Sequence, residues 1–236
     1  MKKILVYSAL TFLCMICILS FILSCIKHNS YELPEVTSND IVQQIPQSTP
    51  WNLILVNSAL PLPENYSLSL AELRNGHAVD ERIYPDLQAM MDAARAEGLN
   101  PLICSSYRSL EKQESLFENK VSEYLSHAYS QEEAEIEAAK WVAKPGTSEH
   151  HTGLAVDIVS MDYQLLDEAQ ETTPEQQWLL QNAHNYGFIL RYPNNKSEIT
   201  GIYYEPWHYR YVGKDVASEI YTQELCLEEY LQNLQK

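Results

Sequence analysis

The sequence predicts an α+β domain in which helices flank a small central antiparallel sheet. Apolar runs of strand length are mixed with longer segments of helical periodicity, in an order typical of that class. The clearest strand is Leu154–Val159, where Leu154, Val156 and Ile158 alternate with Ala155, Asp157 and Val159. No internal repeat is present, so a repeat architecture is not indicated.

The expected elements follow one another from residue 51 to the end of the chain. We expect strands at 53–56, 102–104, 154–159, 188–190 and 202–204, and helices at 84–97, 110–126, 131–140, 174–186 and from 214 onward. Gly98 and Gly187 stop two of the helices, and Thr173 with Pro174 starts another. In the helix at 110–126, Leu116, Val121 and Leu125 are expected to face inward.

The first 50 residues differ from the rest. Lys2 and Lys3 precede a nearly unbroken apolar run to Ile26, which predicts either an uncleaved signal anchor or a lipoprotein signal ending at Cys25. Residues 27–50 are polar and proline-containing, as in an extended tether, so the domain spans 51–236. With the lysines on the cytoplasmic side, the domain would lie on the extracytoplasmic face of the cell membrane.

Charge and cysteine content exclude some classes of protein. The net charge of −16 argues against a nucleic-acid partner, because binding to phosphates needs a basic surface. Cys104 and Cys226 are the two cysteines outside the leader, too few for a disulfide scaffold. They could form one bridge, although two buried thiols are the more common outcome.

The stretch 148–157, Ser-Glu-His-His-Thr-Gly-Leu-Ala-Val-Asp, contains potential metal ligands on both sides of a glycine. Asp157 would project from the strand with Ala155 as its small neighbour on the same face, which leaves room for an ion. His150 and His151 are adjacent, so only one of them can readily face a shared site.

Glu205 and His208 form the second candidate pair. Zinc bound by three protein groups keeps a fourth position for water, and a nearby glutamate can take the proton of that water. His150, Asp157 and His208 would be the ligands and Glu205 the base. Residues three apart on a regular strand point to opposite faces, so the backbone must depart from a strand near Pro206.

These motifs resemble those of a known family. The stretch 148–157, followed about fifty residues later by 205–208, Glu-Pro-Trp-His, is similar to the zinc D-alanyl-D-alanine carboxypeptidases of the VanY type. Residues 105–109, Ser-Ser-Tyr-Arg-Ser, with Gln113 beyond them, resemble the segment that precedes the first metal motif. The resemblance covers roughly Leu53 to Val212 and implies a fold like that of the hedgehog domain and the D-Ala-D-Ala metallopeptidases.

The resemblance also implies roles for individual residues. His150, Asp157 and His208 would bind zinc, and Glu205 would be the general base. Arg108 would face the substrate, where a planar guanidinium suits a terminal carboxylate. Gln113 and Ser148 would help to hold the substrate.

The expected activity is removal of the terminal D-alanine from peptidoglycan stem peptides by a monomeric, zinc-dependent D,D-carboxypeptidase. An L,D-carboxypeptidase or a D-Ala-D-Ala dipeptidase would share the same motifs and stays open. A non-catalytic binder of cell-wall peptides is disfavoured, because a closed structural zinc site needs four protein ligands. A serine-type carboxypeptidase is excluded, because no Ser-x-x-Lys occurs with the Ser-Asp-Asn and Lys-Thr-Gly elements.

Overall fold

A computed structural model describes residues 50–235 of the chain. The leader at 1–26 and nearly all of the tether at 27–50 lie outside these residues, so both stay predictions. Within residues 50–235, no helix has the length and apolar character needed to cross a membrane.

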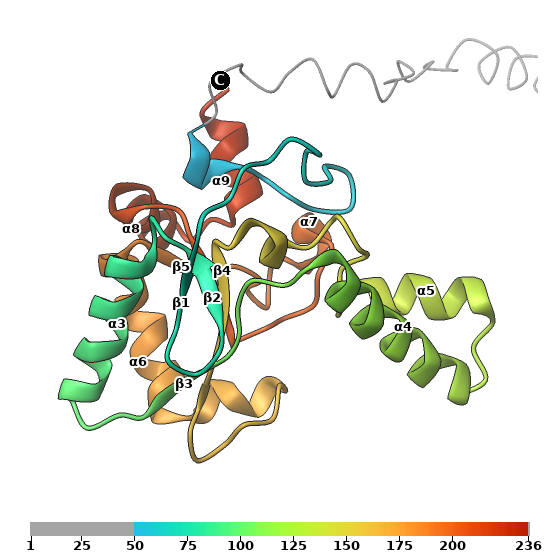
Figure 1. Ribbon diagram of the computed structural model, residues 1–236, viewed down its shortest axis with the longest axis horizontal. Helices are drawn as coiled ribbons and strands as arrows, with labels where there is room; N and C mark the ends of the chain where they lie inside the picture. Colours follow the sequence, from blue (N-terminus) through green and yellow to red (C-terminus); the bar gives the residue numbers. More distant parts are fainter. Residues whose placement is uncertain (1–49, 236) are drawn as a thin grey trace, which may run out of the picture. The chain divides into compact units, whose positions relative to one another are not determined.

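The described part of the chain mixes short strands with seven α-helices (Figure 1), and five of these helices correspond to the predicted ones. The strands are β1 (Leu70–Glu72), β2 (Ala78–Asp80), β3 (Pro101–Ser105), β4 (Ala155–Ser160), β5 (Phe188–Leu190) and β6 (His208–Tyr211). The α-helices are α3 (Tyr84–Ala96), α4 (Leu110–Ser126), α5 (Gln131–Ala139), α6 (Pro174–Asn182), α7 (Ser197–Thr200), α8 (Lys214–Gln223) and α9 (Leu227–Asn233). Short 3-10 helices are η1 (Trp51–Leu53), η2 (Glu149–Thr152), η3 (Glu168–Thr172) and η4 (Ala183–Tyr186).

The central sheet has four strands in the order β3-β4-β6-β5, and every neighbouring pair is antiparallel. This confirms the predicted α+β class. In the β4–β6 ladder, Asp157 lies directly opposite His208 and Ala155 opposite Arg210. The alternation predicted for β4 is also confirmed, since Val156 and Ile158 face the apolar core.

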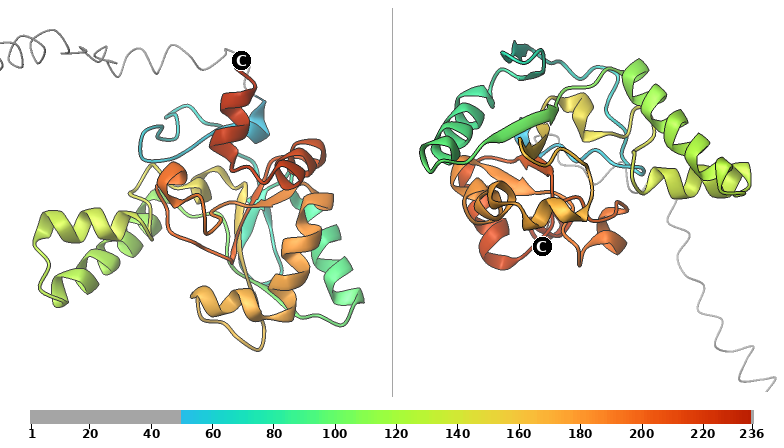
Figure 2. Two further views of the ribbon diagram at one scale, coloured as in Figure 1. Left: turned by 180° about the vertical axis from the view of Figure 1, so that it is seen from behind. Right: turned by 90° about the horizontal axis from the view of Figure 1, so that it is seen from below.

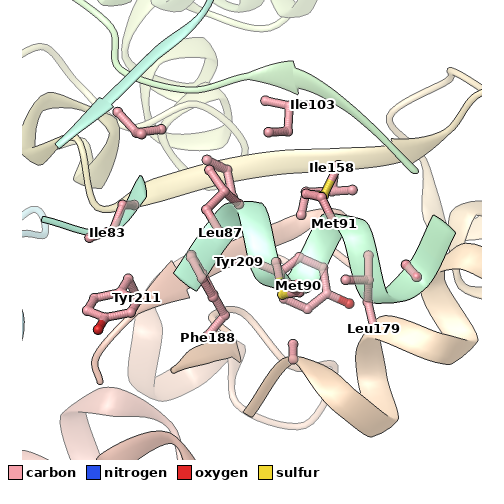
Figure 3. Close-up of a cluster of buried hydrophobic side chains, with 14 of the residues drawn as sticks. Ile83, Leu87, Met90, Met91, Ile103, Ile158, Leu179, Phe188, Tyr209 and Tyr211 are labelled. Atoms are coloured by element: carbon pink, nitrogen blue, oxygen red, sulfur yellow. The ribbon is translucent and has the colours of Figure 1, made fainter. Parts of the chain in front are cut away.

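The main core lies between one face of this sheet and the helices α3 and α6. Figure 3 shows α3 lying against the sheet, with Leu87, Met90 and Met91 near Ile158 and Tyr209. Each fully buried apolar side chain of this kind contributes about 1.5–3 kcal/mol to folding. The opposite face of β4 and β6 is therefore left for polar side chains such as Asp157 and His208.

Helices α4 and α5 form an antiparallel hairpin that extends away from the sheet (Figure 2). Val121 packs there against Ala134 and Ala138. The prediction that Leu125 faces inward is wrong: its side chain is 39% exposed, because this hairpin has only a small apolar seam of its own.

Two predicted strands are absent from the described residues. The segment 53–56 forms the end of η1 and a loop, because the carbonyl groups of Asn52 and Ile54 accept hydrogen bonds from the Arg210 guanidinium instead of a strand. The segment 202–204 is irregular as well, and the Tyr203 amide donates to the carbonyl of Lys140. Conversely, the sequence did not predict the β1–β2 hairpin, whose strands are only three residues long.

Both described cysteines are free thiols. Cys226 is buried, and the Cys104 thiol donates to the Asp157 carbonyl over 3.5 Å. The interpretation as two thiols therefore holds over the alternative of a bridge.

Candidate metal centre and active site

The β4–β6 ladder places the first two candidate ligands side by side. Asp157 and His208 are cross-strand partners, and His208 Nδ1 lies 2.9 Å from Asp157 Oδ1. Both side chains are about 97% buried. Strand alternation thus positions Asp157 as the sequence predicts. The register between β4 and β6 then places His208, about fifty residues further along the chain, beside it.

His150 reaches the same place from a 3-10 turn. Ser148 caps η2 by accepting a hydrogen bond from the His150 amide, and Gly153 ends the turn at a φ of 72°. A Cβ atom at Gly153 would lie 2.8 Å from the Asp80 amide nitrogen, so the close contact with β2 requires glycine. The turn sends His150 toward Asp157, and His151 away to the carbonyl of Arg108.

The three residues fit a divalent metal such as zinc. One ligand atom each from His150, Asp157 and His208 lie within 4.8 Å of one another. His150 Nδ1 is 2.7 Å from the Ser106 carbonyl, whereas its Nε2 is buried without a hydrogen-bond partner, 3.3 Å from Asp157 Oδ2. A buried imidazole nitrogen without a partner beside a carboxylate is the arrangement that a bound cation would complete.

Glu205 lies in the turn just before β6. The His208 amide donates to the Glu205 carbonyl over 3.1 Å, and Pro206 occupies the turn, so the predicted departure from strand geometry is confirmed. Glu205 Oε2 is 3.8 Å from His208 Nδ1. Burial raises the pKa of the Glu205 carboxyl to about 8.

The histidines have opposite electrostatic surroundings. Burial is the main reason that the pKa of His150 falls to about 4. Burial also disfavours the charged form of His208, but its hydrogen bond with Asp157 and the nearby carboxylate of Glu149 outweigh that effect and raise the pKa of His208 to about 9. The pKa of Asp157 stays well below its usual value because the neighbouring histidines overcome the effect of burial. The centre therefore keeps a carboxylate, the hard anionic ligand that a cation needs.

Arg108 lies beside the centre, held by several contacts. Its Nε donates to Ser105 Oγ over 3.0 Å, its Nη1 to Gln113 Oε1 over 2.9 Å, and its Nη2 to Asp157 Oδ2 over 2.9 Å. Gln113 is fully buried and also donates to the carbonyl of Ala143. Gln113 thus contacts Arg108 and does not line the cavity, so any effect of Gln113 on the substrate passes through Arg108.

The three candidate ligands, Glu205 and Arg108 line one cavity of about 240 Å³. Ser148 lines it as well. The sequence did not single out its remaining polar and aromatic walls, Lys120, Trp141 and Tyr192, nor Glu149, which lies behind His208. No motif in the sequence indicates the three wall residues, and none indicates the contact between Glu149 and His208.

The raised pKa of Glu205 predicts a pH-dependent effect in the metal-free protein. Its pKa is 4.5 in an unfolded chain and about 8 when folded, so stability is lost as the pH rises between these values. Relative to wild type, Glu205→Gln should gain roughly 3 kcal/mol in the free energy of unfolding between about pH 4 and about pH 7. Urea titrations with chelator present would measure this, and a constant difference at every pH would refute it.

Three comparisons agree with this geometry. The sequence profile described as VanY, D-alanyl-D-alanine carboxypeptidase, matches residues 76–214. A D-alanyl-D-alanine carboxypeptidase of Enterococcus faecalis is 47% identical over 201 residues, which cover 85% of this chain and 73% of that protein. The structure of VanYB in complex with D-alanine-D-alanine is 49% identical, with a TM-score of 0.72 over 78% of this chain and 98% of that one.

A second solved structure contains the metal. It is a variant of a vancomycin-resistance D,D-pentapeptidase VanY in complex with Zn(II), 48% identical to this chain, with a TM-score of 0.71. The match covers 77% of this chain and 99% of that one. From the extent of the profile match and these identities, the chain belongs to the VanY family of D-alanyl-D-alanine carboxypeptidases.

Proposed function

We propose that this protein is a zinc-dependent D,D-carboxypeptidase that hydrolyses the terminal D-Ala–D-Ala bond of peptidoglycan stem peptides. One observation carries the proposal: the buried cluster of His150, Asp157 and His208 shares a cavity with the carboxylate of Glu205 and the guanidinium of Arg108. Metal ligands, a base and an anchor for a carboxylate are the groups that this hydrolysis needs.

The number of ligands favours a catalytic centre over a structural one. A structural zinc site is closed by four protein groups, whereas a catalytic one leaves a position open. Three residues form the cluster in the described part of the chain, and Glu205 lies at its edge, lining the cavity. A non-catalytic binder of cell-wall peptides with a structural zinc would need a fourth protein ligand, and the cluster in the described residues has three.

A zinc ion bound by these residues would supply Lewis-acid chemistry for cleavage of the peptide bond. Glu205 would accept a proton from the attacking water and return it to the departing amine of D-alanine. Its burial raises its pKa, which suits a group that must both take and give a proton near neutral pH.

Arg108 would bind the terminal carboxylate of the substrate. Its side chain is 16% exposed, and Ser105, Gln113 and Asp157 fix the orientation of the guanidinium. A fixed guanidinium loses little side-chain entropy when it binds a carboxylate. Ser148, which lines the same cavity, is proposed to help hold the peptide.

The D,D-specificity is supported by the relative bound to D-alanine-D-alanine. An L,D-carboxypeptidase acting on a shortened stem, or a dipeptidase acting on free D-Ala-D-Ala, would use the same metal ligands and base. We further propose that the protein acts as a monomer on the extracytoplasmic face of the cell membrane. The apolar run before residue 27 supports this location, because the peptidoglycan substrate lies at that surface.

Replacing Glu205 with Gln separates binding from catalysis. Glu205→Gln should keep its zinc, while release of D-alanine from a pentapeptide stem falls by about 10²- to 10⁴-fold, because the amide cannot accept the proton. Zinc content and D-alanine release would be measured on the same preparation. Glu198→Gln, an exposed glutamate of α7, should behave as wild type. Near-normal turnover by Glu205→Gln would refute this mechanism.

The proposed role of Arg108 predicts a dependence on the peptide terminus. Wild type should prefer a free terminal carboxylate over the corresponding amide, and Arg108→Ala should lose about 10- to 100-fold on the free acid alone, the size of a charge-assisted hydrogen bond. The measurement is kcat/KM on both peptides, with zinc content as a check, since Arg108 also contacts Asp157. An equal loss on acid and amide would contradict the role; Arg95→Ala, at an exposed site on α3, is the control.

A further inference from the structure

We propose that Glu149 is a positioning residue for the metal centre: its carboxylate accepts a hydrogen bond from Nε2–H of His208 and so leaves Nδ1 to bind the metal. The inference rests on the proposed function as a zinc hydrolase. It concerns a residue that has no role in the catalytic mechanism proposed above.

The two ring nitrogens of His208 face different groups. Nδ1 lies 2.9 Å from Asp157 Oδ1 and 3.8 Å from Glu205 Oε2, on the side of the metal cluster. Nε2 points the other way and lies 3.7 Å from Glu149 Oε2. Geometry thus assigns Nδ1 to the metal and Nε2 to Glu149.

The two atoms that face each other across this gap both lack a hydrogen-bond partner within the described part of the chain. Glu149 Oε2 and His208 Nε2 are both buried, and neither has a hydrogen-bond partner in the described residues. Buried polar atoms are nearly always paired, and leaving one unpaired costs about 1–3 kcal/mol. A shift of less than about 1 Å brings this pair to hydrogen-bond distance and satisfies both atoms.

The other oxygen of Glu149 is firmly held. Glu149 Oε1 accepts hydrogen bonds from Arg191 Nε and Arg210 Nη1, each over 2.8 Å, and all three side chains are fully buried. Since both arginines donate to Oε1, Oε2 is the oxygen that remains for His208. Two cations also keep Glu149 an anion, the form that accepts hydrogen bonds without donating any.

The two arginines are themselves anchored at distant points of the chain. Arg191 Nη1 and Nη2 donate to the carboxylate of Glu228 in α9 over 2.8 and 2.6 Å. Arg210 Nη2 donates to the backbone carbonyl groups of Asn52 and Ile54. The carboxylate behind His208 therefore sits on a rigid support, which is the requirement for fixing the orientation of a ligand.

His150 shows the same principle with a different partner. Its Nδ1 lies 2.7 Å from the carbonyl oxygen of Ser106, which leaves Nε2 for the metal. A carbonyl fixes one histidine and a carboxylate the other, so the two ligands present different nitrogens to the same ion. Partners of this type typically change metal affinity by 10- to 100-fold when they are replaced.

A purely structural role is the alternative, in which Glu149 only balances the charges of Arg191 and Arg210. The two roles differ in Glu149→Gln. With its oxygen facing the arginines, the amide would turn its NH₂ toward His208 Nε2 and favour a proton on Nδ1, the wrong nitrogen. A structural role predicts lower stability but unchanged zinc affinity.

The test compares matched variants of the full chain. Glu149→Gln should weaken zinc binding by about 10- to 100-fold in chelator competition, and Glu149→Asp, which keeps the charge, should recover part of it. Glu229→Gln, at the position after Glu228 in α9, breaks an ion pair with Lys196 and changes no hydrogen bond of Arg191 or Arg210, so its zinc affinity should stay within about twofold of wild type even if its stability falls. Equal zinc affinities in wild type and Glu149→Gln would overturn the proposal.

A measurement on the wild type decides the matter if Glu149→Gln does not fold. Long-range ¹H–¹⁵N spectra of the zinc-loaded protein should show His208 protonated at Nε2 and metal-bound at Nδ1, with the reverse for His150. Binding of His208 through Nε2 would overturn the proposal. Neither readout uses a substrate, so a protein that binds zinc in this way but releases no D-alanine would refute only the proposed function.

Discussion

The pairing of β4 with β6 is the constraint on which the site depends. It places Asp157 opposite His208, so two metal ligands from distant parts of the chain become cross-strand neighbours. The apolar residues that alternate with them, Val156 and Tyr209, belong to the core beneath α3. A slip of one residue would turn the ligands into that core and the apolar side chains into the cavity, so burial of the core fixes the register and with it the metal centre.

Charge burial is the second feature that shapes this protein. The side chains of Arg191, Arg210 and Glu149 are fully buried, although isolated buried charges are strongly unfavourable. Their mutual hydrogen bonds offset that cost, and the network joins η1, α9 and the segment next to His150. Replacing all the charged residues of a buried network by apolar ones often costs little stability, so stability alone does not explain why charged residues occupy these positions. Orientation of a metal ligand would explain it.

The local features were predictable, because periodicity and capping act within a few residues. Helix α4 begins and ends as expected, and Asp157 projects from the face that alternation assigns to it. The strands predicted at 53–56 and 202–204 do not form, because backbone groups in or next to these segments make hydrogen bonds with Arg210 and Lys140. These partners lie far away in the sequence, so local patterns could not reveal them. The sequence did not single out Glu149 for a similar reason. Its proposed role depends on Arg191 and Arg210, which only the fold brings into contact with it.

The most direct test of the proposed hydrolase is an assay of the zinc-loaded full chain on a pentapeptide stem, a tetrapeptide stem and free D-Ala-D-Ala. We expect D-alanine to be released from the pentapeptide in preference to the other two, to cease when a chelator removes the metal, and to return when zinc is restored. Hydrolysis that persists without metal, or no release from any of the three substrates, would contradict the account.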